Sequence, residues 1–264
     1  MKKIINNIIK INNKLLGNKY FTIIPGPCSI ENFKQLFSVI EFLKKEKINL
    51  IRAGTFKLRT NSKSFQGLGY KSIEIIKEIK KNFNINIVSE ITKIKDIEIF
   101  YNLVDIMQVG TRNMYNYPLL KELGKTKKTI ILKRAFCSTV KEFILSSEYI
   151  IKEGNKNLIL CERGIRTFEN STRNTLDLSS VSLIKKELNF PIIIDPSHAL
   201  GRTDILTKMC LAGVVSGADG ILIEINEYPK KSLSDSRQTI NFEKFKKLLK
   251  FIKKMLEEIG KKYN

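Results

Sequence analysis

Residues that can bind metals, anions or protons recur in this chain at the ends of short apolar runs. Eight runs have this form, at 21–27, 48–51, 85–89, 104–110, 129–132, 158–161, 191–197 and 220–223. The reactive residues at or just beyond their ends are Cys28, Arg52, Glu90, Arg112, Lys133, Arg163, His198 and Glu224. Because the carboxyl ends of parallel strands gather at one face of a barrel, this pattern predicts a single enzyme site at that face.

Segments with helical periodicity separate the runs. The clearest spans 242–259, where Phe245, Leu248, Leu249 and Ile252 share one face and lysines occupy the other. Further candidates lie at about 31–46, 69–82, 92–102, 115–124, 138–153, 174–188 and 202–217. Regular alternation of strands and helices is typical of parallel βα units.

These elements predict an α/β fold of the (β/α)8 TIM-barrel type. We expect a single barrel domain over 21–264, preceded by an N-terminal extension over 1–20. The extension is either a helix or hairpin that closes the bottom of the barrel, or a frayed terminus. An open doubly wound sheet is the alternative fold. It is disfavoured because the chain has eight units and lacks a Gly-rich phosphate fingerprint after the first strand.

The composition narrows the class of protein. The chain has 264 residues and four cysteines, none of them in a CxxC pair, so we expect reduced thiols and a cytoplasmic location. Its apolar stretches stay below the roughly 18 residues of a membrane span. The net charge of +21 is typical of nucleic-acid partners, but the lysines are spread along the chain, so we expect no such partner.

Four residues of metal-ligand type are predicted to converge: Cys28, His198, Glu224 and Asp235. The first, seventh and eighth strands become neighbours when a barrel closes, and Asp235 follows the eighth. Each of these residues alone could have a purely structural role, but the convergence of all four favours a metal site. Such a mixed donor set suits one divalent ion, Mn, Fe, Co or Zn. Since His198 is the only histidine, zinc centres that need two histidines are excluded.

Cations also gather at the predicted strand ends, namely Arg52, Lys57, Arg59, Arg112, Lys133 and Arg163. Two like charges about 4 Å apart repel by about 4 kcal/mol at an effective dielectric near 20. Six of them at one face are therefore unfavourable unless an anion binds there. Phosphate groups suit this set, because arginine binds them through two parallel hydrogen bonds and lysine as a point charge.

Several motifs together resemble the short, class I beta type of 3-deoxy-D-arabino-heptulosonate-7-phosphate (DAHP) synthase. They are PGPCSIE at 25–31, IRAGTFKLRTNSKSFQGLG at 51–69, MQVGTRNMYNY at 107–117, LKR at 132–134, CERGIRTFE at 161–169, IDPSHALGR at 194–202, and IEIN with LSDSRQ within 223–238. The resemblance covers about residues 21–240. It implies a metal-dependent transferase that condenses phosphoenolpyruvate with D-erythrose 4-phosphate, the first step of the shikimate pathway to aromatic amino acids.

The resemblance also implies roles for individual residues. As metal ligands it gives Cys28, His198, Glu224 and Asp235. For phosphoenolpyruvate it gives Arg112, Lys133 and Arg163, with Arg52 and Lys57 beside them. For erythrose 4-phosphate it gives Lys57, Arg59 and Thr60. The expected catalytic set is Lys133, Glu90, Cys28 and His198. Our own hypothesis for this reaction is that Lys133 and Glu90 position the attacking water and move its protons.

The chain departs from the family pattern at four places that bear on loop dynamics and rate. Leu58 replaces the proline of KPRT, Ala135 the glycine of LKRG and Ser236 the glycine of SDG, while Asn226-Glu227 stands for His-Pro.

Two rival functions remain open. The first is 3-deoxy-manno-octulosonate-8-phosphate synthase, which uses arabinose 5-phosphate; the KLRT sequence favours the four-carbon sugar. The second is a non-catalytic relative of the barrel. The resemblance also implies a homo-oligomer, a dimer or tetramer, and association with chorismate mutase in some relatives.

Overall fold

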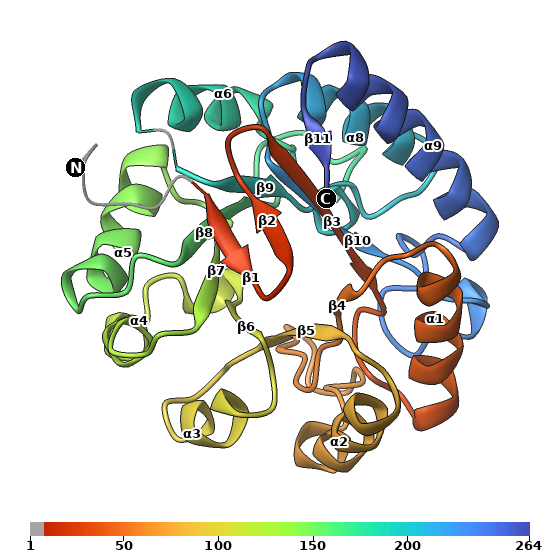
Figure 1. Ribbon diagram of the computed structural model, residues 1–264. Helices are drawn as coiled ribbons and strands as arrows, with labels where there is room; N and C mark the ends of the chain where they lie inside the picture. Colours follow the sequence, from red (N-terminus) through yellow and green to blue (C-terminus); the bar gives the residue numbers. More distant parts are fainter. Residues whose placement is uncertain (1–7, 189) are drawn as a thin grey trace.

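The computed structural model describes residues 8–188 and 190–264 and has the predicted α/β barrel (Figure 1). The eight strands of the barrel are β3 (Tyr20–Gly26), β4 (Leu50–Arg52), β5 (Asn86–Glu90), β6 (Ile106–Val109), β7 (Thr129–Lys133), β8 (Leu158–Glu162), β9 (Ile192–Ile194) and β10 (Gly220–Glu224). Each lies in one of the predicted runs or overlaps it. The TIM-barrel prediction is confirmed.

The strands pair in parallel in the order β3-β10-β9-β8-β7-β6-β5-β4. The short C-terminal strand β11 (Lys262–Tyr263) pairs with the start of β3. At the other end of β3, its backbone meets β4 closely. A Cβ atom on Gly26, whose φ is +150°, would lie 2.0 Å from the carbonyl oxygen of Arg52. Glycine therefore allows the first and second strands of the barrel to approach where the site is formed.

Helices surround the sheet in the predicted segments. They are α1 (Phe33–Lys45), α2 (Ser72–Asn82), α3 (Asp96–Tyr101), α4 (Tyr117–Gly124), α5 (Val140–Lys152), α6 (Leu178–Glu187), α8 (Leu206–Val215) and α9 (Phe242–Glu258). Several begin later than the periodicity indicates, because a side chain accepts a hydrogen bond from the first turn and fixes the N-terminus. Asn32, Thr139 and Asp177 act in this way, and Asn241 caps α9, which begins at residue 242 as predicted.

One predicted boundary is wrong. The apolar run 191–197 is not one strand, because β9 ends at Ile194 and a short helix, α7 (Pro196–Leu200), follows at once. Asp195 caps this helix by accepting a hydrogen bond from the backbone N–H of His198, and Pro196 occupies its first turn, where a missing N–H costs nothing. His198 consequently lies on a helical turn above the strand end.

A hairpin of β1 (Ile9–Ile11) and β2 (Lys14–Leu16) covers the N-terminal end of the barrel (Figure 1). Its residues Ile9, Ile11 and Leu16 join the cluster inside the barrel, which includes Ile24 and Leu222. The hairpin is tied to the barrel where the hydroxyl of Thr22 donates to the Leu15 carbonyl at 3.0 Å. The division of the chain at residue 20 stays a prediction, and residues 1–7 lie outside the described part.

In the described part of the chain, no helix is both long and apolar enough to cross a lipid bilayer.

The hairpin should contribute to the stability of the barrel. Leu16 is fully buried, so we expect Leu16→Ala to lower the free energy of unfolding by about 2–5 kcal/mol, as for other large-to-small core substitutions. Denaturant-induced unfolding measures this change. Leu15→Ala, at the neighbouring half-buried position, is the control and should cost less. An unchanged free energy of unfolding in Leu16→Ala would show that the hairpin is not part of the core.

Candidate active site

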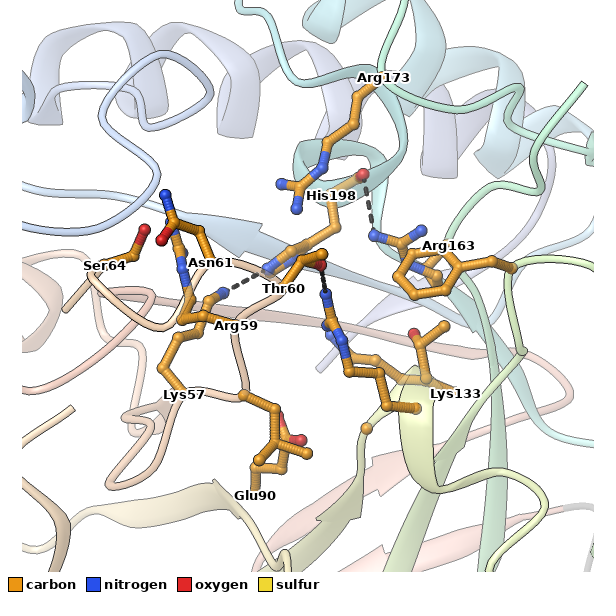
Figure 2. A pocket seen from close by; sticks show the side chains of 15 residues that line it. Lys57, Arg59, Thr60, Asn61, Ser64, Glu90, Lys133, Arg163, Arg173 and His198 are labelled. Atoms are coloured by element: carbon orange, nitrogen blue, oxygen red, sulfur yellow. Dashed lines mark hydrogen bonds between the residues drawn. The ribbon is translucent and has the colours of Figure 1, made fainter. Parts of the chain in front are cut away.

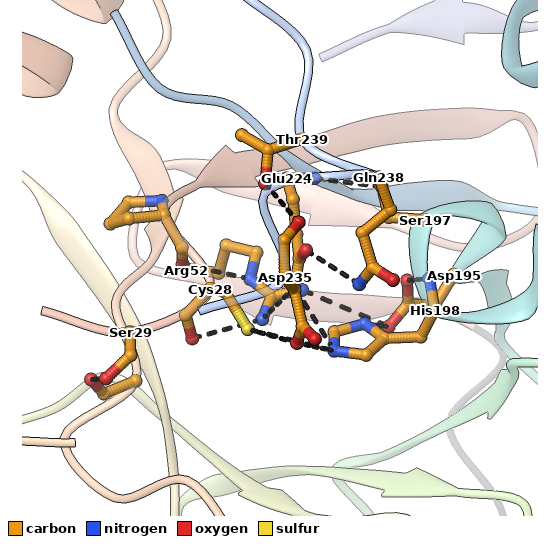
Figure 3. A network of polar contacts seen from close by, with 12 residues as sticks. Cys28, Ser29, Arg52, Asp195, Ser197, His198, Glu224, Asp235, Gln238 and Thr239 are labelled. Carbon is orange, nitrogen blue, oxygen red and sulfur yellow. Dashed lines mark hydrogen bonds and ion pairs between the residues drawn. The ribbon is translucent and has the colours of Figure 1, made fainter. Parts of the chain in front are cut away.

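Four predicted ligand residues meet at the C-terminal end of the barrel (Figure 3). Cys28 follows β3, Glu224 ends β10, His198 lies on α7, and Asp235 lies in the loop after β10. One donor atom from each lies within 4.8 Å of the other three. Asp235 adopts a left-handed backbone with φ of 51°, which aspartate tolerates better than most residues. The predicted convergence of these four side chains is thus present in the structure.

The Nε2 atom of His198 faces this group. It lies 3.1 Å from Glu224 Oε1 and 3.9 Å from the Sγ atom of Cys28. The other ring nitrogen, Nδ1, lies 2.8 Å from Oδ2 of Asp195, whose second oxygen accepts the backbone N–H of His198. A carboxylate on Nδ1 fixes the ring orientation and leaves Nε2 as the free ligand atom, as in many metal centres.

Burial sets the protonation of the group. It lowers the pKa of His198 to about 4, although Asp195 and Glu224 oppose this shift, so the imidazole is neutral near pH 7. Burial, reinforced by the nearby Glu224, raises the pKa of the Cys28 thiol. For Asp235, burial favours the protonated form, but Lys57 and His198 outweigh it and hold the pKa well below its usual range. A neutral imidazole and ionised carboxylates are ligand-ready, whereas the thiol needs a cation to ionise.

Four cations contact the ligand group, namely Lys57, Arg52, Arg59 and Arg173, and the first two are the most deeply buried. The Nζ atom of Lys57 is 2.6 Å from Cys28 Sγ, 2.7 Å from Asp235 Oδ2 and 3.0 Å from His198 Nε2. Arg52 lies beneath, with one guanidinium nitrogen 3.2 Å from Glu224 Oε1. Buried charges are stable only when paired, and these contacts supply the pairing.

A cavity of about 220 Å³ opens beside the group (Figure 2). Its cationic lining comprises Lys57, Arg59, Arg112, Lys133, Arg163 and Arg173. Thr60 lines it too, and its hydroxyl accepts a hydrogen bond from Arg112 at 2.8 Å. Of the six predicted cations, only Arg52 is outside this lining, and it borders a smaller cavity with Glu90 and Lys133.

An aromatic ring holds the arginines in place. The guanidinium carbons of Arg112, Arg163 and Arg166 lie 5.2, 4.7 and 4.8 Å from the centroid of the Phe136 ring. Arg163 also donates to the carbonyl of His198 at 3.1 Å. Burial lowers the pKa of Arg163 to about 10, which still leaves it charged near pH 7. The cavity therefore presents oriented positive charge.

Lys133 and Glu90 face the same cavity from the ends of β7 and β5, which lie on either side of β6 in the sheet. The ammonium of Lys133 lies 2.5 Å from Asp195 Oδ2, so one carboxylate contacts both Lys133 and His198. Gly110 makes room for Glu90, because a Cβ atom there would lie 2.0 Å from Glu90 Oε1. Partial burial raises the pKa of Glu90, against the opposing effect of Lys133. Glu90 is a carboxyl group whose proton is held more tightly than usual.

Reasoning from strand ends missed three site residues. Asp195 has a sequence signal, since an Asp-Pro pair three residues before a histidine is a typical helix start. Arg173 lies in the long loop after β8 and lines both the cavity and an adjoining open cleft of about 870 Å³. Gln238 donates to Glu224 Oε2 at 2.8 Å. Neither of these two has a distinct sequence signal.

Two of the unusual positions have clear structural roles. Asn226 does not point into the ligand group; its amide donates to Ser232 at 2.8 Å and accepts from the backbone of Tyr228 at 3.1 Å. Leu58 lines the cavity between Lys57 and Arg59.

Comparisons with known proteins agree on one family. A model of the DAHP synthetase I family matches residues 6–261. Phospho-2-dehydro-3-deoxyheptonate aldolase of Thermotoga maritima is 43% identical over 98% of this chain and 77% of its own. A crystal structure of that enzyme, also called DAHP synthase, covers 98% of this chain and 76% of its own with a TM-score of 0.94.

More distant relatives carry the name of the rival enzyme. The 2-dehydro-3-deoxyphosphooctonate aldolase of Geobacter sulfurreducens is 25% identical over 91% of this chain and 94% of its own. By contrast, a second solved structure, a truncated DAHP synthase from T. maritima, is 40% identical to this chain and has a TM-score of 0.91. The match covers 98% of this chain and 95% of that chain. These matches confirm the resemblance seen in the motifs, and the chain belongs to the DAHP synthetase I family.

Proposed function

We propose that this protein condenses phosphoenolpyruvate with D-erythrose 4-phosphate and water to give DAHP and inorganic phosphate. The observation that carries the proposal is the six-cation cavity placed directly against the Cys28–His198–Glu224–Asp235 group. The substrates of this enzyme are phosphorylated small molecules, whose negative charge matches the positive charge of the cavity. The free state of all four cysteines suits a cytoplasmic enzyme. A homo-oligomer and a chorismate mutase partner stay predictions.

The four ligand residues fit a divalent metal. Among the described residues, buried Glu224 Oε1 makes no hydrogen bond and faces only the ion-paired Arg52 and the ring of His198, while a thiol, an imidazole and a second carboxylate converge around it. Mn, Fe, Co and Zn all accept such a set. When bound, the ion would act as a Lewis acid toward the aldehyde carbonyl. Asp195 would then keep His198 aligned from behind.

The cations divide between the two substrates. Arg112, Lys133 and Arg163 are placed to bind the phosphate and carboxylate of phosphoenolpyruvate, and Phe136 holds both guanidinium groups. Arg59 and Thr60, on the loop after β4, would receive the phosphate of the aldose. Orienting two bound reactants makes the carbon–carbon bond-forming step effectively unimolecular.

The chemistry then follows from charge placement. The methylene carbon of phosphoenolpyruvate uses its π electrons to attack the aldehyde carbon, whose C=O π electrons move onto the aldehyde oxygen and take up a proton there, and positive charge develops at C2. Water adds to C2 and loses one proton. Loss of its second proton forms the ketone as the C2–O bond to phosphate breaks, and inorganic phosphate leaves with the electrons of that bond. Glu90 and Lys133 line the cavity where this water must stand, so we assign them to its positioning and proton transfer.

The choice of aldose can be tested directly. With Mn²⁺ and phosphoenolpyruvate, we expect phosphate release with erythrose 4-phosphate and little with arabinose 5-phosphate. Cys28→Ala should reduce both activity and bound metal, whereas Cys137→Ala, at an exposed thiol, should change neither. Turnover with arabinose 5-phosphate alone would favour the octulosonate enzyme. Turnover with neither sugar would favour a non-catalytic barrel.

Glu90→Gln tests the proton-transfer role and the raised pKa together. Loss of a general acid–base group should lower kcat by about 10²–10⁴-fold. Since the folded protein holds the Glu90 proton more tightly than the unfolded chain, the stabilisation it brings is lost as the pH rises through the raised pKa. The variant escapes this loss. Denaturant unfolding measured at several pH values from about 4.5 to 8 tests this. The free energy of unfolding of Glu90→Gln, relative to that of the wild type, should increase as the pH rises.

An unchanged kcat in Glu90→Gln would remove Glu90 from the reaction. A difference in unfolding free energy that does not vary with pH would contradict the raised pKa.

A further inference from the structure

The ammonium of Lys57 lies where the ligand atoms of the candidate metal site converge. Its Nζ atom contacts Cys28 Sγ, Asp235 Oδ2 and His198 Nε2 at 2.6, 2.7 and 3.0 Å. These are three of the four groups that would bind the ion. The contacts are shorter than the 3.3 Å between Arg59 and Asp235 Oδ1, so Lys57 is the cation most closely surrounded by the group.

An ammonium and a divalent ion cannot share these ligand atoms. Protein ligands lie about 2.0–2.3 Å from a metal such as zinc, which would bring the ion into contact with the present position of Nζ. Repulsion between the two positive charges at such a distance is large in a buried site. One of the two must leave when the other binds.

We propose that Lys57 holds the ligand group together in the metal-free protein, and that a divalent ion displaces its ammonium into the adjoining cavity. This proposal rests on the proposed function, because it takes the four residues as metal ligands. Lys57 lines that cavity beside Arg59 and Lys133, so the displaced ammonium adds positive charge where a phosphorylated substrate is expected.

The backbone supports a movement of the side chain alone. The N–H of Lys57 donates to the carbonyl of Gln66 at 2.8 Å, and Gly67 packs against it so closely that a Cβ there would lie 3.2 Å from the nitrogen of Lys57. The loop is therefore anchored at residue 57, and the flexible side chain carries the charge from one site to the other. Metal binding and anion binding then favour each other, and such coupling is reciprocal.

Calorimetric titration of Mn²⁺ into metal-free protein tests the competition. We expect Lys57→Met to bind Mn²⁺ more tightly than the wild type by about tenfold, because no ammonium must be displaced. Arg59→Met is the matched control, since it also removes a positive charge next to Asp235 but one that does not contact Cys28 or His198. It should tighten Mn²⁺ binding by much less. Lys57→Gln provides a second variant if Lys57→Met folds poorly.

A second titration uses phosphoenolpyruvate without any aldose, so no turnover occurs. In the wild type and in Arg59→Met, Mn²⁺ should strengthen phosphoenolpyruvate binding, and in Lys57→Met this gain should shrink. Equal Mn²⁺ affinity in the wild type and Lys57→Met, or an equal increase in both variants, would overturn the displacement while leaving the metal site intact. Absence of Mn²⁺ binding in every variant would instead refute the proposed metal site itself.

Discussion

The carboxylate of Asp195 connects the two halves of the site. One of its oxygens lies 2.8 Å from His198 Nδ1 and 2.5 Å from Lys133 Nζ, while the other accepts the backbone N–H of His198 in the first turn of α7. Burial alone would raise its pKa, but His198 and Lys133 hold the pKa well below its usual value. His198, Lys133 and the more distant Arg52 thus compensate this buried negative charge, which contacts both the metal side and the anion side of the site.

Compensation of buried charge extends outward from this carboxylate. Glu224 is paired with Arg52, and Asp235 with Lys57 and Arg59. Cations that face the cavity, such as Arg112 and Arg163, instead stack on Phe136 and have few acidic partners nearby. The site therefore contains one region whose charges are balanced internally and another that needs a bound anion, which is the arrangement expected of an enzyme for phosphorylated substrates.

Much of this arrangement could be predicted from the sequence, because a parallel barrel brings strand ends together. Cys28, Arg112, Lys133 and Glu224 were found in this way. The rule does not tell which of two adjacent residues faces inward: Lys133 enters the site, whereas Arg134 pairs with Glu162 at 2.9 Å. Nor does it find Asp195 and Arg173, whose positions depend on a helix start and a long loop. For the N-terminal extension, the sequence leaves a helix, a hairpin and a frayed terminus all open. It cannot choose between them because the short strands of the hairpin are stabilised by packing into the end of the barrel.

The double role of Asp195 is the central claim, and one pair of titrations on Asp195→Asn tests it most directly. Calorimetry with Mn²⁺, and with phosphoenolpyruvate in the absence of an aldose, should show both affinities reduced, that for the metal by about 10–100-fold. Asparagine keeps the shape of the side chain. The loss of affinity would therefore reflect the absence of the negative charge that Asp195 places beside His198 and Lys133. Wild-type affinity for both ligands in a folded Asp195→Asn protein would contradict the account.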